Sequence, residues 1–325
     1  MYDLTQNTLA GQQALFPDAS IPAAEPRHLL ASKDLEPGEI RLILDLAKIL
    51  KRQRNRLAQP IQPVENRILA MIFEKQSLRT RFTFETAIME LGGHAIYLTK
   101  ADIDMGERES VYDVANNISR WSTMIVARLK SHQSLVELAK HSSVPVINAL
   151  TDLEHPCQAL ADLMTVEEHL GAGPLNLAWI GDGNNVANSF AVTAAKLGHE
   201  VVICTPPGYE AVDECYALGS VTHCYDPAEA VSGAHAVYTD VWISMGQEDE
   251  KQERLKRFAK YQVNADLMAK ADENAVFLHC LPARRDQEVT GEVIDGNQSV
   301  VFDQAENRLH TQKALMKLIL DGVLN

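Results

Sequence analysis

The sequence predicts an α/β protein of two doubly wound parallel-sheet domains with an interdomain active-site cleft. Short apolar blocks alternate with segments of helical period from about residue 34 onward. The chain has 325 residues, too many for one small core, and suits two domains of about 150 residues each. A break of small residues from Gly171 to Pro174 divides the pattern evenly.

The alternation of apolar blocks and helical segments predicts where the helices and strands lie. Helices are expected near residues 37–54, 81–91, 110–120, 133–140, 156–170, 186–197, 209–218, 253–261, 264–271 and 305–321. Strands are expected near residues 67–73, 94–98, 123–128, 144–148, 175–180, 200–204, 221–224, 236–241, 275–280 and 299–302. One sheet with so many strands would be unusual. We therefore expect an N-terminal extension at 1–27, one domain at 28–170 and another at 171–304, with the C-terminal helix (305–325) able to pack on either.

Composition excludes several classes of function. The net charge of −14 argues against a nucleic-acid or anionic-membrane partner. No apolar run approaches the roughly 20 residues that cross a bilayer. The five cysteines are scattered without a CxxC pair, which is typical of the reduced cytoplasm. The first 26 residues lack Lys, Arg and an apolar core, so they resemble neither a secretory nor a mitochondrial signal.

The segment Ser77-Leu78-Arg79-Thr80-Arg81 lies between a strand-like block and a helix. The first N–H groups of a helix lack partners and favour negative charge, and an arginine can hold a phosphate with two hydrogen bonds. The segment therefore predicts an anion site. An ordinary polar helix cap with a solvated arginine fits this segment equally well.

Other polar residues also follow strands, where ligands bind in open α/β sheets. Arg128 ends one block and is a second candidate for the anion, or else a surface ion-pair partner. His155 and Gln158 flank Pro156 at a helix start, where they can bind a carbonyl oxygen or an amide, or simply cap the helix. Cys157 is expected to be a small packed residue.

Two later loops favour a small amine ligand. The stretch from Gly181 to Asn185 lies where dinucleotide folds bind phosphate, but it lacks the third glycine, and no acidic residue ends the next strand. This argues against a nicotinamide cofactor and for a small polar ligand. Asp240 follows a strand and can bind an ammonium group, with residues 246–251 as a candidate lid, although a solvated loop is the alternative.

His279 and Cys280 end another strand block. A cysteine there can have a lowered thiol pKa and act as a nucleophile or proton partner, or it can be a buried structural residue. Two ligands are weak support for a metal, so none is expected. Arg308 in the C-terminal helix is a third candidate for the anion. Together these residues suit an anionic carbonyl compound and an amine.

These motifs resemble the signatures of the carbamoyltransferases. Ser77-Leu78-Arg79-Thr80-Arg81, His155-Pro156-Cys157-Gln158 and His279-Cys280-Leu281-Pro282 look like the three family motifs. Asp240 with Ser244-Met245-Gly246 resembles the amino-acid loop of the ornithine-specific members. Aspartate-specific members carry HPTQ and HPLP and lack that loop. The resemblance covers about residues 28–325.

The resemblance implies two α/β domains in a homotrimer or a multiple of trimers, active sites at subunit interfaces and no cofactor. Carbamoyl phosphate would be bound by Ser77, Leu78, Arg79, Thr80, Arg128, His155, Gln158, Cys280, Leu281 and Arg308. Ornithine would be bound by Asn185, Asp240, Ser244 and Met245. The catalytic residues would be Arg128, His155, Asp240 and Cys280. Arg81 would instead be a structural ion-pair residue.

The implied reaction converts carbamoyl phosphate and L-ornithine to L-citrulline and phosphate, in arginine biosynthesis or in the reverse, catabolic direction. Putrescine or an acylated ornithine as acceptor, and a non-catalytic carbamoyl phosphate-binding role, stay open as alternatives. The chain departs from the family pattern at Leu78, where threonine is commoner, and at Asp104, where relatives carry glutamine or histidine. A carboxylate at Asp104 would repel a neighbouring subunit's phosphate.

Overall fold

The computed structural model describes residues 25–55, 67–243 and 248–324. Most of the predicted extension at 1–27 lies outside these ranges, as do Ser244 and Met245. In the part of the chain that the structure describes, no helix is both long and apolar enough to cross a membrane.

The first lobe is built on a four-stranded parallel sheet in the order β2-β1-β3-β4. Its strands are β1 (Ile68–Phe73), β2 (His94–Thr99), β3 (Met124–Arg128) and β4 (Val146–Leu150). Its helices are α2 (Pro37–Asn55), α3 (Leu78–Glu90), α4 (Lys100–Ile103), α5 (Val111–Trp121) and α6 (His132–His141). Buried apolar side chains from α4, α5 and α6 cover one face of the sheet, and those from α2 and α3 belong to the core on the other face.

The second lobe is built on a five-stranded parallel sheet in the order β7-β6-β5-β8-β9. Its strands are β5 (Asn176–Ile180), β6 (Glu200–Cys204), β7 (Val221–Cys224), β8 (Ala236–Tyr238) and β9 (Val276–Leu278). Its helices are α8 (Asn185–Lys196), α9 (Asp213–Tyr216), α10 (Pro227–Val231), α11 (Lys251–Phe258), α12 (Ala265–Met268) and α13 (Gly291–Ile294). Short 3-10 turns occupy Ser32–Asp34, Glu248–Glu250 and Ala259–Tyr261.

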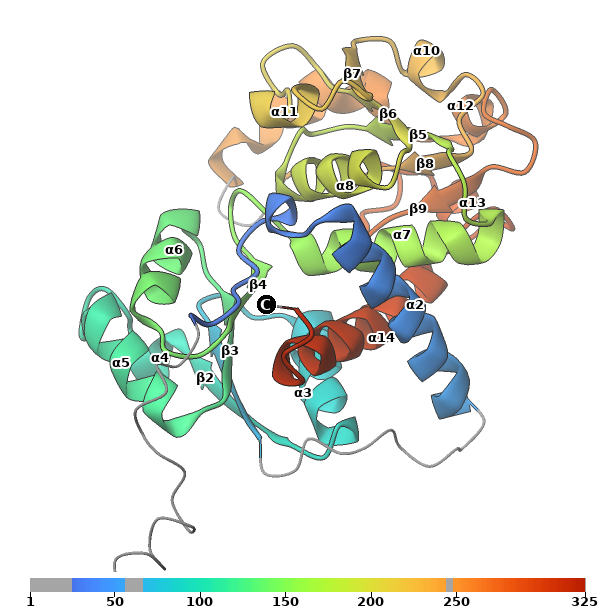
Figure 1. Cartoon of the computed structure of the whole chain (residues 1–325). Helices are drawn as coiled ribbons and strands as arrows, with labels where there is room; N and C mark the ends of the chain where they lie inside the picture. The colour runs from blue at the N-terminus through green and yellow to red at the C-terminus, as the bar shows by residue number, and fades with distance from the viewer. Residues whose placement is uncertain (1–24, 56–66, 244–247, 325) are drawn as a thin grey trace, which may run out of the picture.

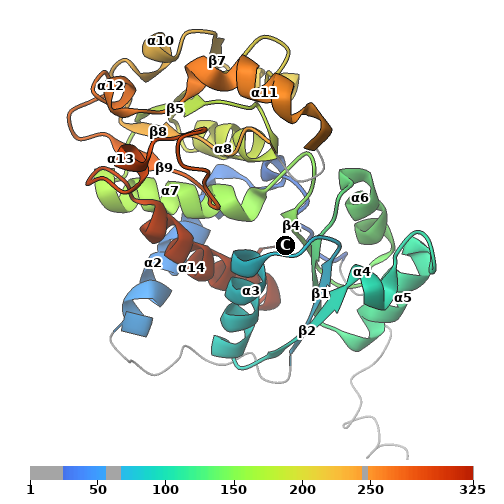
Figure 2. The same ribbon diagram turned by 180° about the vertical axis from the view of Figure 1, so that it is seen from behind.

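Two long helices connect the lobes. The helix α7 (Pro156–Leu170) packs on α8, and the C-terminal helix α14 (Val301–Leu320) packs against α7, α2 and α3 (Figures 1 and 2). Their apolar side chains join one continuous core that reaches both sheets. The C-terminal helix therefore starts at the second lobe and returns to the first.

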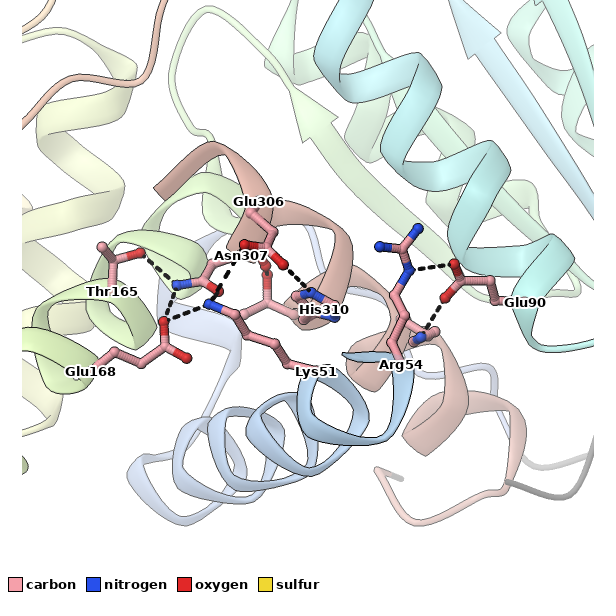
Figure 3. A network of polar contacts seen from close by, with 10 residues as sticks. Lys51, Arg54, Glu90, Thr165, Glu168, Glu306, Asn307 and His310 are labelled. Atoms are coloured by element: carbon pink, nitrogen blue, oxygen red, sulfur yellow. Dashed lines mark hydrogen bonds and ion pairs between the residues drawn. The ribbon is translucent and has the colours of Figure 1, made fainter. Parts of the chain in front are cut away.

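A polar seam stabilises the packing of these helices (Figure 3). The ammonium group of Lys51 on α2 donates to Glu168 of α7 and to the amide oxygen of Asn307 on α14, each at 2.8 Å. Glu90 at the end of α3 accepts from Arg54 at 2.7 Å and from Lys313 at 2.5 Å. These contacts connect α2, α3, α7 and α14.

The structure confirms the predicted parallel α/β class, with differences at the chain's later elements. The predicted strand at 299–302 is wrong, because only one bridge joins Ser299 to Phe277 before α14 begins at Val301. The helices predicted at 209–218 and 264–271 shorten to single turns. The backbone N–H of Phe277 donates to Gln298 and its carbonyl oxygen accepts from Val300, so the chain pairs with β9 at this single residue and then turns into α14.

We expect Gly183→Ala to destabilise the protein strongly. A Cβ atom at Gly183 would lie 2.3 Å from the backbone nitrogen of Ala211 and 2.6 Å from the carbonyl oxygen of Tyr209. Overpacking against a rigid backbone typically costs about 1–3 kcal/mol, so the thermal unfolding midpoint should fall by several degrees. Gly38→Ala is the matched control, since a Cβ atom there meets nothing within 4 Å. An unchanged midpoint in Gly183→Ala would contradict this packing.

Candidate active site

Several of the predicted site residues lie at or just beyond the carboxyl ends of strands in both sheets. Arg128 is the last residue of β3, and α3 follows the neighbouring strand β1. Asp240 and Cys280 each lie two residues beyond neighbouring strands, β8 and β9. Adjacent parallel strands end at the same edge of a sheet. The strand order therefore brings Arg128 close to α3, and Asp240 close to Cys280.

Two buried arginines meet at one hydroxyl. Arg128 and Arg308, which are 8% and 2% exposed, each place a guanidinium nitrogen 3.4 Å from Oγ1 of Thr80. Burial, then the charge of Arg308, lowers the pKa of Arg128 to about 10. Within the described ranges neither guanidinium lies within 4.0 Å of a carboxylate. The pair therefore presents positive charge that no carboxylate of the described residues contacts directly, although the buried Asp162 partly opposes the lowering of the Arg308 pKa by burial.

The N-terminus of α3 adds further donors. Ser77 caps the helix by accepting the backbone N–H of Thr80 on its Oγ at 3.3 Å. Leu78 is 77% exposed at the first helical position, so it offers the site its backbone rather than its side chain. Burial lowers the pKa of Arg79, while the nearby Cys280 and Asp240 oppose that shift. Arg79 therefore lies close to groups of the second lobe.

His155 and Gln158 begin α7, as the sequence predicts. His155 is the N-cap residue, and its Nδ1 is buried without a hydrogen-bond partner. Burial and the charges of Arg308 and Arg128 hold the imidazole pKa well below its usual value, so the ring is neutral at pH 7. The side-chain oxygen of Gln158 accepts from Nη1 of Arg308 at 2.5 Å. Both residues thus face the arginine pair.

Asp240 and Cys280 form a direct contact. The thiol of Cys280 donates to Oδ1 of Asp240 at 3.2 Å, and the amide of Asn184 donates to Oδ2 at 2.9 Å. Of the two alternatives for Cys280, the lowered thiol pKa does not hold, because burial and the adjacent Asp240 raise the pKa well above its ordinary value. Cys280 is therefore a neutral hydrogen-bond donor, and a thiolate nucleophile is not available at neutral pH.

Asp240, His279 and Cys280 have ligand atoms within 4.8 Å of one another, but they suit a metal poorly. Nδ1 of His279 accepts the backbone N–H of Leu281 at 2.9 Å, and Nε2 contacts Glu288 at 3.2 Å. Both ring nitrogens are already engaged, and the thiol is protonated. The contact with His279 instead holds the backbone of Leu281, the next residue in the predicted site.

The asparagine loop differs in detail from the prediction. Asn185 donates its amide to the carbonyl oxygen of Thr151 at 2.5 Å. Its neighbour Asn184, which the sequence analysis did not single out, is the residue that contacts Asp240. Asn184 also caps α8 by accepting from Val186 and Ala187, a signal that a search for helix caps finds.

Two further predictions concern residues outside this cluster. Arg81 pairs with Glu85 at 2.8 Å and lies over the ring of Tyr97, which confirms its structural assignment. Asp104 caps the end of α4 with its backbone in the left-handed conformation, and its Oδ1 lies 3.4 Å from Nζ of Lys100. That lysine partly compensates the carboxylate that departs from the family pattern.

Comparison with known proteins divides the chain into the same two parts as the two lobes. The profile "Aspartate/ornithine carbamoyltransferase, carbamoyl-P binding domain" matches residues 27–168, and the "Asp/Orn binding domain" profile matches residues 174–319. An ornithine carbamoyltransferase of Carboxydothermus hydrogenoformans is 49% identical over 307 residues, or 90% of this chain and 97% of that protein. A Bacillus subtilis ornithine carbamoyltransferase is 47% identical, covering 98% of this chain and 97% of its own.

A solved structure is similar throughout. The ornithine carbamoyltransferase of Pyrococcus furiosus superposes with a TM-score of 0.88 at 44% identity, covering 93% of this chain and 99% of that one. The chain therefore belongs to the aspartate/ornithine carbamoyltransferase family.

We expect inorganic phosphate to stabilise the protein through Arg128 and Arg308. A ligand at a hundred times its Kd adds about 2.7 kcal/mol to the free energy of unfolding, which is visible as a rise in the thermal midpoint. Arg128→Gln or Arg308→Gln should remove most of this rise. Arg285→Gln is the control, because Arg285 forms an exposed pair with Asp295. Equal stabilisation by chloride at the same ionic strength would contradict a specific site.

Proposed function

We propose that the chain transfers the carbamoyl group of carbamoyl phosphate to the δ-amine of L-ornithine, giving L-citrulline and phosphate. One observation carries the proposal: two buried guanidinium groups without a directly paired carboxylate share Thr80, and Arg79 beside them is close to the Asp240–Cys280 pair. Guanidinium groups beside a carboxylate suit an anionic donor and a cationic amino acid as neighbouring ligands.

The donor half of the site would bind carbamoyl phosphate. The phosphate would accept from the α3 N-terminus at Ser77, Leu78 and Thr80, and from the guanidinium groups of Arg79, Arg128 and Arg308. The carbonyl oxygen would accept from Arg128, from neutral His155 and from the backbone around Cys280 and Leu281. The carbamoyl NH2 would face Gln158. A neutral His155 suits this role, because it donates a hydrogen bond without adding a third buried charge.

The acceptor half would bind ornithine. Asp240 would hold its α-ammonium group, and Asn185, Ser244 and Met245 would complete the pocket, with Asn184 fixing the orientation of Asp240. The Cys280 thiol would stay protonated and aligned on Asp240, close to the attacking amine.

The reaction would be a direct attack of the neutral δ-amine on the carbamoyl carbon. A C–N bond forms, the carbonyl oxygen gains charge, and the C–O bond to phosphate then breaks. Arg128 and His155 would stabilise the oxyanion, and Arg79 and Arg308 the leaving phosphate. The amine proton would leave toward Asp240 or the departing phosphate. Holding two substrates in line provides much of the acceleration.

The assembly is proposed to be a homotrimer. Exposed apolar side chains are aligned along α3, with Leu78, Phe82 and Met89 between 65% and 77% exposed, and these suit burial against another copy. An apolar cavity of about 280 Å³, lined by residues that include Ile96 and Trp121, lies at the β2 edge of the first sheet.

All five cysteines are unpaired, which supports a cytoplasmic location.

We expect Arg128→Ala to lower kcat by about 10²–10³-fold or more, the scale of losing an oxyanion donor. Citrulline formation from carbamoyl phosphate and ornithine measures it directly. The Arg285→Gln variant controls for general effects of losing an arginine. Near-normal turnover of Arg128→Ala would refute its role, and absence of citrulline with the unaltered protein would refute the proposed reaction.

A substrate panel tests the acceptor. With carbamoyl phosphate held constant, ornithine should be used. N-acetylornithine should react poorly because its acylated α-nitrogen carries no charge for Asp240 to hold, and putrescine should react poorly because it lacks the α-carboxylate that the rest of the pocket would bind. Asp240→Asn should raise the KM for ornithine by about tenfold or more, since a charge-assisted hydrogen bond contributes about 1.5–3 kcal/mol. Preference for either analogue over ornithine would replace the proposed acceptor.

A further inference from the structure

A buried carboxylate that the proposed reaction does not use lies directly behind the site. Asp162 on α7 has no exposed surface. Its Oδ1 accepts from the side-chain NH2 of Gln158 and from that of Gln304, each at 2.7 Å. Gln158 is one turn earlier on α7, and Gln304 is in the first turn of α14. One oxygen atom therefore holds two amides from the two connecting helices.

This arrangement fixes which way each amide points. A glutamine whose NH2 group donates to a carboxylate must present its carbonyl oxygen elsewhere. The oxygen of Gln158 accepts from Nη1 of Arg308. The oxygen of Gln304 accepts the backbone N–H of His279 at 2.9 Å. Rotation of either amide by 180° would place an NH2 group against another donor, so both contacts depend on the acceptor at Asp162.

We propose that Asp162 is a positioning residue that fixes Gln158 and Gln304, and through them Arg308 and the His279–Leu281 backbone. The inference rests on the proposed function and deepens it, because the two amides lead to the donor-binding arginine in one direction and to the strand end beside Asp240 in the other. Asp162 touches no substrate in this account.

The charge of Asp162 is costly to bury, which argues against a merely space-filling role. Burial raises its pKa to about 7, although Gln158, Gln304 and Arg308 oppose the shift. Its charge, in addition to burial, raises the pKa values of Tyr238 and Cys280. A buried apolar residue of similar size often serves stability as well or better. A carboxylate at this position therefore suits a task that needs an acceptor.

Three variants separate positioning from packing. Asp162→Leu removes the acceptor at similar volume, and Asp162→Asn keeps one acceptor oxygen without the charge. Thr165→Val is the matched control one turn along α7. It removes the buried hydroxyl that accepts from the side-chain NH2 of Asn307 on α14, and this contact does not involve Gln158 (Figure 3). Each is assayed for kcat, KM for carbamoyl phosphate, thermal midpoint and Kd for inorganic phosphate.

Asp162→Leu should lower kcat/KM for carbamoyl phosphate by about 100-fold, the effect of misplacing a catalytic group by about 1 Å, and should weaken phosphate binding. Asp162→Asn should recover most of that loss. Thr165→Val should lower the midpoint without changing kcat/KM. Adding Gln304→Leu to Asp162→Leu should cost less than Gln304→Leu costs alone, because both changes break the same contact.

Kinetic constants for Asp162→Leu within about twofold of the unaltered protein would overturn the inference. Losses of kcat/KM that follow the fall in thermal midpoint in every variant would also overturn it. Both results leave the proposed function standing, since the unaltered protein would still form citrulline. If it forms none while binding phosphate, the proposed function fails, and the phosphate Kd of the Asp162 variants alone decides the positioning role.

Discussion

The central constraint in this molecule is the burial of Arg128 and Arg308 without a carboxylate partner. Removing two like charges from water is unfavourable: burial lowers the pKa of both arginines, and the charge of Arg308 lowers that of Arg128 further. The chain offsets this cost only partly, with the hydroxyl of Thr80, the amide of Gln158 and the charge of the buried Asp162. The remaining positive charge is what a small dianion can neutralise, even though the protein as a whole carries −14.

The helices α7 and α14 convert this electrostatic feature into a precise site. One carries Gln158 and Asp162, with His155 as its N-cap residue, and the other carries Gln304 and Arg308, so the contact between the two helices brings these residues together. In the polar seam, Glu168 of α7 and Asn307 of α14 contact Lys51 of α2 (Figure 3). Packing, hydrogen bonding and function therefore share the same two elements, and the site spans both lobes.

The sequence predicts the parallel α/β class and the grouping of strand-end residues well, because parallel topology places successive strand ends at one edge. It fails where a property depends on burial. The thiol pKa of Cys280 is raised rather than lowered, since its environment is closed and acidic. The contact of Asn184 with Asp240 depends on local cap geometry, which the sequence pattern does not predict. The pattern does not single out Asp162 either, because an acidic residue in a helix resembles a solvated one until its neighbours are known.

The most direct test of this account is a crystal structure of the protein with carbamoyl phosphate. The account predicts the phosphate within hydrogen-bond distance of Arg79, Arg128, Arg308 and the α3 N-terminus, with the carbamoyl group toward His155. Clear density for the ligand at any other place, or a carboxylate of the chain paired with Arg128 and Arg308, would contradict the central role of their uncompensated charge.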